Sequence, residues 1–173
     1  PIYLPANRTF GDEHTMSHSL DHIMKPSSVA VIGASTKPHT IGSDLMKRLI
    51  EFGFKGRIYP VNPKGGMIEG LQAYPSVLDI EGPVDMAVIV VNSKFVLSTI
   101  DQCHEKGVKG LVVISAGFKE SGKEGAEMEA QLYERVKKYG MRCVGPNCLG
   151  VVNTHPDLSL IHISEPTRLG MIS

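Results

Sequence analysis

A glycine-containing turn is the part of this 173-residue chain best suited to binding an anion. The segment 28–35 (SVAVIGAS) has the pattern of a β-strand that ends at Gly33, and a polar loop then leads from Thr36 to Gly42. A strand, a tight turn and a helix in this order bring unpaired backbone N–H groups and a helix N-terminus to one point. The sequence therefore predicts that the phosphates of a nucleotide bind at this turn.

Lysines follow several of the expected strands and would add positive charge beside that turn. They are Lys37, Lys64, Lys94 and Lys119. A lysine ammonium is a common point-charge partner of phosphate, although any single loop lysine is at least as often simply solvated. As a group, the four predict a ligand that carries several phosphates.

Apolar runs alternate with amphipathic stretches along the chain. Strands are expected at 28–35, 55–61, 85–91, 109–115 and 141–144. Helices are expected at 41–52, 95–106 and 124–139, with short helices at 17–24 and 75–80. The short helix at 17–24 is expected to begin at a Ser cap and to be a lead-in rather than a core element.

The alternation predicts the fold class. Strands without polar alternation are typical of sheets that are covered on both sides. We expect an α/β, Rossmann-like, doubly wound fold, with a mainly parallel five-stranded sheet and helices on both faces. In such sheets the loops after the strands converge on one ligand crevice. These loops are 33–42, 62–66, 92–94, 115–119 and 146–148.

Two features expected of a dinucleotide site are missing. Gly33 and Gly42 are too far apart to form a GxGxxG fingerprint, and no acidic residue closes the second strand, which ends instead in Asn62, Pro63 and Lys64. A lysine suits a phosphate better than a ribose diol. An NAD(P)-binding oxidoreductase fragment remains an alternative, but these absences weaken it.

The composition of the chain argues against nucleic acid and membranes as binding partners. The chain is 42% hydrophobic and carries 18 basic and 18 acidic residues, so no basic field attracts nucleic acid or a membrane surface. No apolar run reaches the roughly 20 residues that span a bilayer. The three cysteines form no CxxC pair. We expect a soluble cytoplasmic protein with reduced cysteines, no nucleic-acid or membrane partner and no metal site.

Three further side chains or segments have two interpretations each. Cys148 follows a GPN turn, but a small packing residue is favoured over a nucleophile because no basic partner is evident. His39 lies in the phosphate loop, where solvation is favoured over a ligand contact. The charged run 119–123 is either a mobile flap or a solvated loop.

Five segments carry a family resemblance. In chain order, SVAVIGAST, GRIYPVNPKG, VDMAVIVVNSK, GLVVISAGF and RCVGPNCLG closely resemble the coenzyme A-binding domain of NDP-forming acyl-CoA synthetases. The resemblance runs from about Met16 to Leu160. It extends to the α subunit of succinyl-CoA synthetase and to CoA-binding modules joined to protein acetyltransferases. It implies that the bound cofactor is coenzyme A or an acyl-CoA.

The resemblance also implies a role for each loop. The turn from Gly33 to Gly42 would wrap the CoA phosphates, and Lys64 would meet a phosphate of the ADP moiety. Asn92 and Ser93 would line the nucleotide edge, while 114–116 would touch the pantetheine arm and the turn 145–147 would face the catalytic centre. The expected binding residues are Gly33, Ala34, Ser35, Thr36, Lys37, Ile41, Gly42, Asn62, Pro63, Lys64, Val91, Asn92, Ser93, Ile114, Ser115, Ala116, Pro146 and Asn147.

The resembling enzymes also need parts that are absent here. There, acyl-CoA and phosphate give an acyl phosphate, and the phosphoryl group passes to a histidine and then to ADP. No histidine of this chain matches that residue, so we assign no catalytic residue. The leading interpretation is the CoA-binding domain of an ADP-forming acetyl-CoA synthetase, with the C-terminal ligase and ATP-grasp domains as missing partners. The alternative is a CoA- or nucleotide-sensing regulatory module of a protein acetyltransferase.

The domain boundaries follow from the same comparison. Residues 1–15 are expected to be extraneous or disordered, 16–160 to form the CoA-binding Rossmann-like domain, and 161–173 to be a non-native-looking tail. A surface left by missing domains would allow an oligomer.

Overall fold

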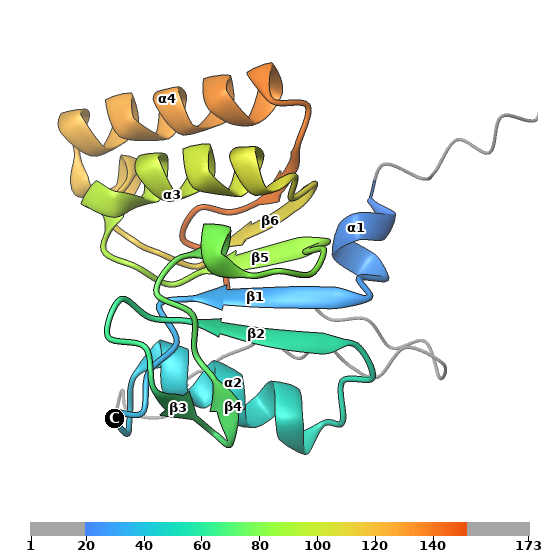
Figure 1. Cartoon of the computed structure of the whole chain (residues 1–173). Coiled ribbons are helices and arrows are strands. Elements are labelled where there is room, and N and C mark those ends of the chain that lie inside the picture. Colours follow the sequence, from blue (N-terminus) through green and yellow to red (C-terminus); the bar gives the residue numbers. More distant parts are fainter. Residues whose placement is uncertain (1–19, 152–173) are drawn as a thin grey trace, which may run out of the picture.

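A five-stranded parallel sheet is the centre of the computed structural model, which describes residues 20–151. Its strands are β1 (Ser28–Ile32), β2 (Arg57–Val61), β5 (Met86–Ile89), β6 (Gly110–Val113) and β7 (Arg142–Val144). They lie in the order β2-β1-β5-β6-β7, and every neighbouring pair is parallel (Figure 1). The expected sheet is therefore confirmed.

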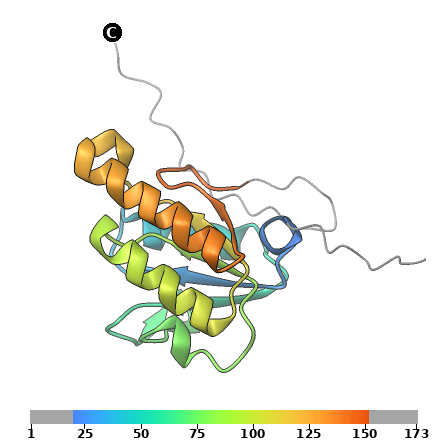
Figure 2. The ribbon, with the colours of Figure 1, turned by 90° about the horizontal axis from the view of Figure 1, so that it is seen from above.

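Helices cover both faces of the sheet. The helix α2 (Ile41–Glu51) lies on one side, and α3 (Ser93–Lys106) and α4 (Lys123–Lys138) lie next to each other on the other (Figures 1 and 2). The strand order reverses between β1 and β5, which is the topology of a doubly wound fold. The α/β class and the two-sided cover agree with the sequence prediction.

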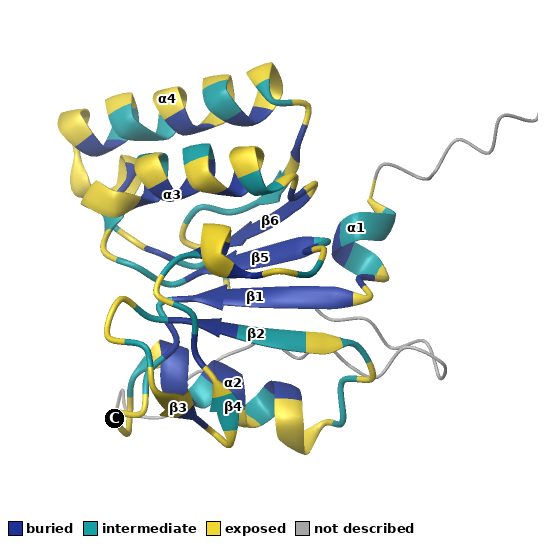
Figure 3. Cartoon of the chain, viewed as in Figure 1, coloured by how far each residue is buried: buried dark blue, intermediate teal, exposed yellow. Residues whose placement is uncertain are grey.

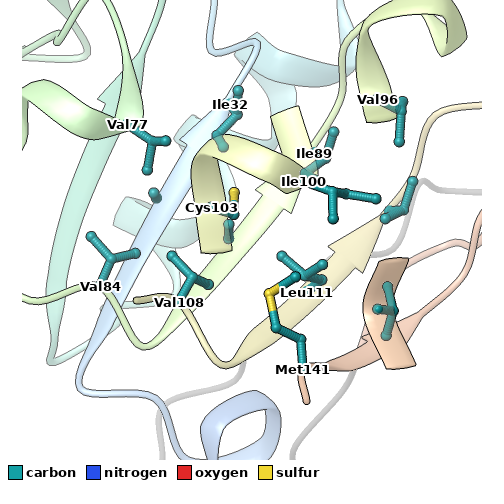
Figure 4. Close-up of a cluster of buried hydrophobic side chains, with 14 of the residues drawn as sticks. Ile32, Val77, Val84, Ile89, Val96, Ile100, Cys103, Val108, Leu111 and Met141 are labelled. Atoms are coloured by element: carbon teal, nitrogen blue, oxygen red, sulfur yellow. The ribbon is translucent and has the colours of Figure 1, made fainter. Parts of the chain in front are cut away.

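Alternate residues of the central strands point to opposite faces of the sheet and belong to two separate hydrophobic cores. Val29 and Val31 of β1 pack on the α2 side, whereas Ala30 and Ile32 pack beneath α3 and α4. Figure 3 shows β1 and β5 buried along their length, and Figure 4 shows the α3 side, where Ile100 and other helix residues meet side chains from the strands. Burial on both faces explains why these strands lack polar alternation.

Short elements complete the described chain. They are the helix α1 (Asp21–Met24), the 3₁₀ turns η1 (Val77–Asp79) and η2 (Lys119–Ser121), and a two-stranded hairpin of β3 (Met67–Ile68) and β4 (Leu71–Gln72). The hairpin was not expected from sequence. Within residues 20–151 no helix is both long and apolar enough to cross a bilayer.

The prediction for the first helix is wrong in two respects. The helix begins at Asp21 after Leu20, which makes no side-chain cap bond, so there is no Ser cap. It is also part of the core, because Ile23 is only 1% exposed and packs in the α2-side cluster. A Cβ on Gly110 would lie 2.8 Å from the His22 carbonyl oxygen, so α1 sits directly on the start of β6. The boundaries proposed at 15–16 and 160–161 lie outside the described residues.

The buried position of Ile23 predicts a large loss of stability in the Ile23→Ala variant. Truncating a fully buried Ile removes apolar contacts and leaves a cavity, so the free energy of unfolding should fall by about 3 kcal/mol. Denaturant unfolding measures this free energy. The control is Leu20→Ala, since Leu20 is 54% exposed and should change the value by less than about 0.5 kcal/mol. Equal, small effects of both variants would contradict a core role for α1.

Candidate functional site

The loops that follow the five strands lie along one edge of the sheet. Because all the strands are parallel, their carboxyl ends point to the same side, which is the side of the arrowheads in Figure 1. Gly33, Lys64 and Ser115 are therefore on one edge of the molecule. The predicted loops are neighbours in the order of the strands, so a single extended ligand could contact all of them.

The turn after β1 is built by close backbone approach. Gly33 has φ +100°, and a Cβ there would be 2.9 Å from the Val90 carbonyl oxygen. A Cβ on Gly42 would be 2.1 Å from the Gly33 carbonyl oxygen, which only glycine permits. Thr40 caps α2, because its Oγ1 accepts from the Ser43 N–H at 3.3 Å and donates to the Lys37 carbonyl at 2.8 Å. These contacts hold the N-terminus of α2 at the sheet edge.

Ser43 is a residue that sequence reasoning missed. It lies in the first turn of α2, is 1% exposed, and its Oγ has no hydrogen-bond partner among residues 20–151. A buried hydroxyl without a partner is unusual, and this one lies beneath the surface at the N-terminus of α2. The sequence signal was a serine at a position of the helix where the buried face should be apolar.

Asn62 joins the second loop to the first. Its Nδ2 donates to the Ala34 carbonyl at 2.8 Å, and its Oδ1 accepts from the Lys64 N–H at 2.9 Å. The amide therefore fixes the position of Lys64 relative to the glycine turn. This residue stands where a dinucleotide site would have a carboxylate for the ribose, and both of its polar atoms are already engaged.

The remaining loops are linked in the same way. Asn92 caps α3 by accepting from the Lys94 N–H at 3.2 Å, so α3 begins two residues before the expected Phe95. The buried Ser115 donates through Oγ to the Val91 carbonyl at 2.5 Å, and its own carbonyl accepts from the Asn147 N–H at 3.0 Å. The hydroxyl proton of Ser115 is therefore used in a hydrogen bond between two loops of the protein.

Exposure divides the predicted binding residues into three groups. Ala34, Gly42 and Ser115 are buried, so their part in the site is to shape the backbone. The half-buried residues are Gly33, Ser35, Asn62, Val91, Ser93, Ile114 and Pro146. The exposed residues are Thr36, Lys37, Ile41, Pro63, Lys64, Asn92, Ala116 and Asn147. All are at the same edge, and their contact with a ligand stays a prediction.

The charge of this edge favours an anion. The five loops contain the four lysines named above and no aspartate or glutamate, and all four lysines are exposed. Two helices, α2 and α3, also begin here, and their first N–H groups have no partner within the helix. The part of the edge after β1, β2 and β5 is therefore locally positive, although the whole chain has zero formal net charge.

The loop after β6 is instead closed by carboxylates of the chain. The Oε1 atom of Glu120 accepts from the N–H groups of Gly117 and Phe118 at 2.6 and 3.1 Å, and Glu129 Oε2 accepts from the Lys119 N–H at 3.2 Å. The bonds from Gly117, from Phe118 and from its own N–H lower the pKa of Glu120. The run 119–123 is thus a hydrogen-bonded 3₁₀ turn leading into α4.

Cys148 has the environment of a packing residue. Its Sγ lies 3.3 Å from the Val113 carbonyl oxygen, and burial raises its pKa, which disfavours the thiolate that a nucleophile needs. Burial also raises the pKa of Cys143 to about 12, with a smaller contribution from the charge of Cys148. In the described part of the chain, no three His, Cys, Asp or Glu side chains group as metal ligands would.

Comparison with known proteins identifies the family. Residues 27–154 match the family described as "CoA binding domain". The chain belongs to this CoA-binding domain family. The match includes all five strands and all five loops of the sheet edge.

Relatives of this CoA-binding domain are larger proteins. The α subunit of acetate–CoA ligase [ADP-forming] I of Pyrococcus furiosus is 54% identical over 145 residues, which are 82% of this chain and 31% of the relative. The acetate–CoA ligase [ADP-forming] of Methanocaldococcus jannaschii is 46% identical over 82% of this chain and 20% of its own length. The chain thus spans between a fifth and a third of these two relatives.

Solved structures agree with the fold of the domain. Acetyl-coenzyme A synthetase 1 of Ca. Korarchaeum cryptofilum, in complex with phosphate and ADP, superposes with a TM-score of 0.72 at 47% identity. The match covers 76% of this chain and 28% of that one. A protein from Pyrococcus horikoshii superposes with a TM-score of 0.76 at 50% identity, covering 80% of this chain and 32% of that one.

The contacts of Glu120 predict its titration. Since backbone N–H groups stabilise its carboxylate, its pKa should lie below the ordinary value of 4.5. The stabilisation is complete above the unfolded-state pKa and is lost as the pH falls through the lower, folded-state pKa. An NMR titration that follows the Glu120 carboxyl carbon and the Gly117 amide measures the pKa of Glu120.

The control for this titration is Glu120→Gln, which keeps an amide oxygen but cannot ionise. Its Gly117 amide shift should be flat between about pH 2.5 and 6. A Glu120 midpoint at or above the ordinary value in the unsubstituted chain would contradict the hydrogen bonds described here.

Proposed function

We propose that this chain is the CoA-binding part of an ADP-forming acetate–CoA ligase and that CoA lies along the loop edge of the sheet. The observation that carries the proposal is the N-terminus of α2. There, helix N–H groups and the exposed Lys37 lie at the turn after β1, and the Asn62–Ala34 bond holds the Lys64 loop against it. The unpartnered Ser43 hydroxyl is buried just beneath this turn. Helix N–H groups and lysine ammonium groups are common partners of phosphate.

The geometry also supports a direction for the ligand. The N-terminus of α2, Lys37 and Lys64 lie after β1 and β2, at one end of the edge, so the ADP moiety lies there. Strands are about 4.8 Å apart, so the edge from β2 to β7 is about 19 Å long, which suits an extended pantetheine arm. The arm then passes 114–116, and the thiol reaches the turn 145–147.

Activity is proposed for the complete enzyme and not for this piece. The full reaction converts acyl-CoA, ADP and phosphate to the acid, ATP and CoA. The relatives named as ADP-forming acetate–CoA ligases support it, and their greater length supports further ligase and ATP-grasp domains as partners. Residues 16–160 are the proposed binding domain and the cytoplasm its proposed location. Alone, the chain binds CoA without turnover.

Ligand choice tests this proposal. Titration calorimetry on the 173-residue chain should show binding of CoA and of its nucleotide half, adenosine 3′,5′-bisphosphate. NAD should bind more weakly than CoA, because Asn62 offers no carboxylate to a ribose diol. Tighter binding of NAD than of CoA would refute the proposal in favour of an oxidoreductase fragment.

Ser43→Ala gives a second test. Removing a buried hydroxyl that has no partner should leave the free energy of unfolding of the unliganded chain unchanged or raise it by about 1 kcal/mol. Because the hydroxyl is buried, it can donate to a CoA phosphate only if the start of α2 shifts on binding. In that case CoA affinity should fall about fivefold in the same variant. Thermal unfolding and calorimetry measure the two effects.

The control for this substitution is Ser98→Ala, because Ser98 is exposed and bonds only its own helix, at the Phe95 carbonyl. Its CoA affinity should equal that of the unsubstituted chain. Unchanged CoA affinity in Ser43→Ala would remove this residue from the proposed site.

A further inference from the structure

Two side chains of α4, one helical turn apart, contact two different loops of the sheet edge. Tyr133 Oη donates to the Gly145 carbonyl at 3.2 Å, and Glu129 accepts from the Lys119 N–H at 3.2 Å. Residues four apart lie on the same face of a helix. We propose that Glu129 and Tyr133 are positioning residues that fix the two loops at the pantetheine end of the CoA site, an inference that rests on the proposed function.

The two loops form one unit. Asn147 donates to the Ser115 carbonyl at 3.0 Å, which joins the turn after β7 to the loop after β6. Gly145 lies against the end of β6, since a Cβ there would be 2.2 Å from the Val113 carbonyl oxygen. The sheet thus holds this unit from one side, and α4 holds it from another.

Helix α4 is close enough to act as a support. A Cβ on Gly125 would be 1.9 Å from the Phe118 carbonyl oxygen, so the first turns of α4 touch the loop after β6. The hydrophobic attachment of α4 comes from other residues, chiefly the buried Leu132 and Val136. Tyr133 is 47% exposed, so its hydroxyl can be removed without disturbing that core.

The protonation of Tyr133 suits this role. Burial raises the pKa of its phenol, and the negative charge of Glu129 raises it further, followed by that of Cys143. The hydroxyl therefore remains a donor at neutral pH. The Glu129 carboxylate accepts from the Lys119 N–H, whereas the Tyr133 hydroxyl donates to the Gly145 carbonyl, so the two side chains act on separate loops.

The proposed nucleotide-binding features, which are the N-terminus of α2, Lys37 and Lys64, are at the other end of the edge, after β1 and β2. Loosening the loops after β6 and β7 should therefore weaken contacts to the pantetheine arm and leave contacts to the nucleotide half unchanged. A defect that merely destabilised the fold would weaken both. This difference separates positioning from general structural support.

The test compares two ligands in the 173-residue chain by titration calorimetry. In Tyr133→Phe and in Glu129→Ala, the Kd for CoA should rise about three- to tenfold, while the Kd for adenosine 3′,5′-bisphosphate should stay within about twofold. Glu129→Gln keeps an acceptor oxygen and should restore most of the CoA affinity.

Tyr139→Phe is the matched control. Tyr139 follows the last residue of α4, and its hydroxyl donates to Asp101 at 2.8 Å, away from the site loops, so both affinities should be unchanged. The inference is overturned if Tyr133→Phe binds CoA as tightly as the unsubstituted chain, or if it loses both ligands equally. Failure of the unsubstituted chain to bind CoA would refute the proposed function itself, and the inference with it.

Discussion

The contact between the start of α2 and the turn after β1 is the constraint on which the candidate site depends. With glycine at position 42, the helix backbone approaches the Gly33 carbonyl so closely that a Cβ would lie 2.1 Å from that oxygen. This contact determines where the first turn of α2 and its unpaired N–H groups lie. Any side chain at position 42 would push the helix away and separate Ser43 from the polar loop.

Lateral bonds extend this arrangement across the sheet. Asn62 ties the loops after β2 and β1 together, Ser115 ties the loop after β6 to Val91 at the end of β5, and Asn147 ties the turn after β7 to Ser115. Loops that bind ligands work best when a rigid scaffold fixes them. Here the strands supply the spacing, and the side-chain bonds keep each loop in register with its neighbour.

The elements that could be predicted from sequence are those with a strong local pattern. Buried strands such as 85–91 read as unbroken apolar runs, and the 3.6-residue spacing of Leu45, Met46 and Leu49 identified α2. Once the strands were known to be parallel, their loops had to meet at one edge. The turn at Gly33 and the lysine-bearing loops could therefore be assigned to that edge before the structure was known.

Features set by contacts between distant segments could not be predicted. The hairpin has strands of only two residues, and the chain after it is held by a parallel bridge from Tyr74 to Val61 rather than by a local signal. Glu129 and Tyr133 look like ordinary surface residues of an amphipathic helix. Their role depends on the distance from α4 to two other loops, which no periodicity encodes.

The position of Ile23 determines how short a segment of this protein can be and still keep its hydrophobic core. The segment matched by the family begins at residue 27, four residues after this side chain. A piece trimmed to that boundary would lose the whole of α1, including the Ile23 side chain that packs in the α2-side cluster and against Gly110 at the start of β6. The boundary that the family match marks is thus narrower than the boundary that burial requires.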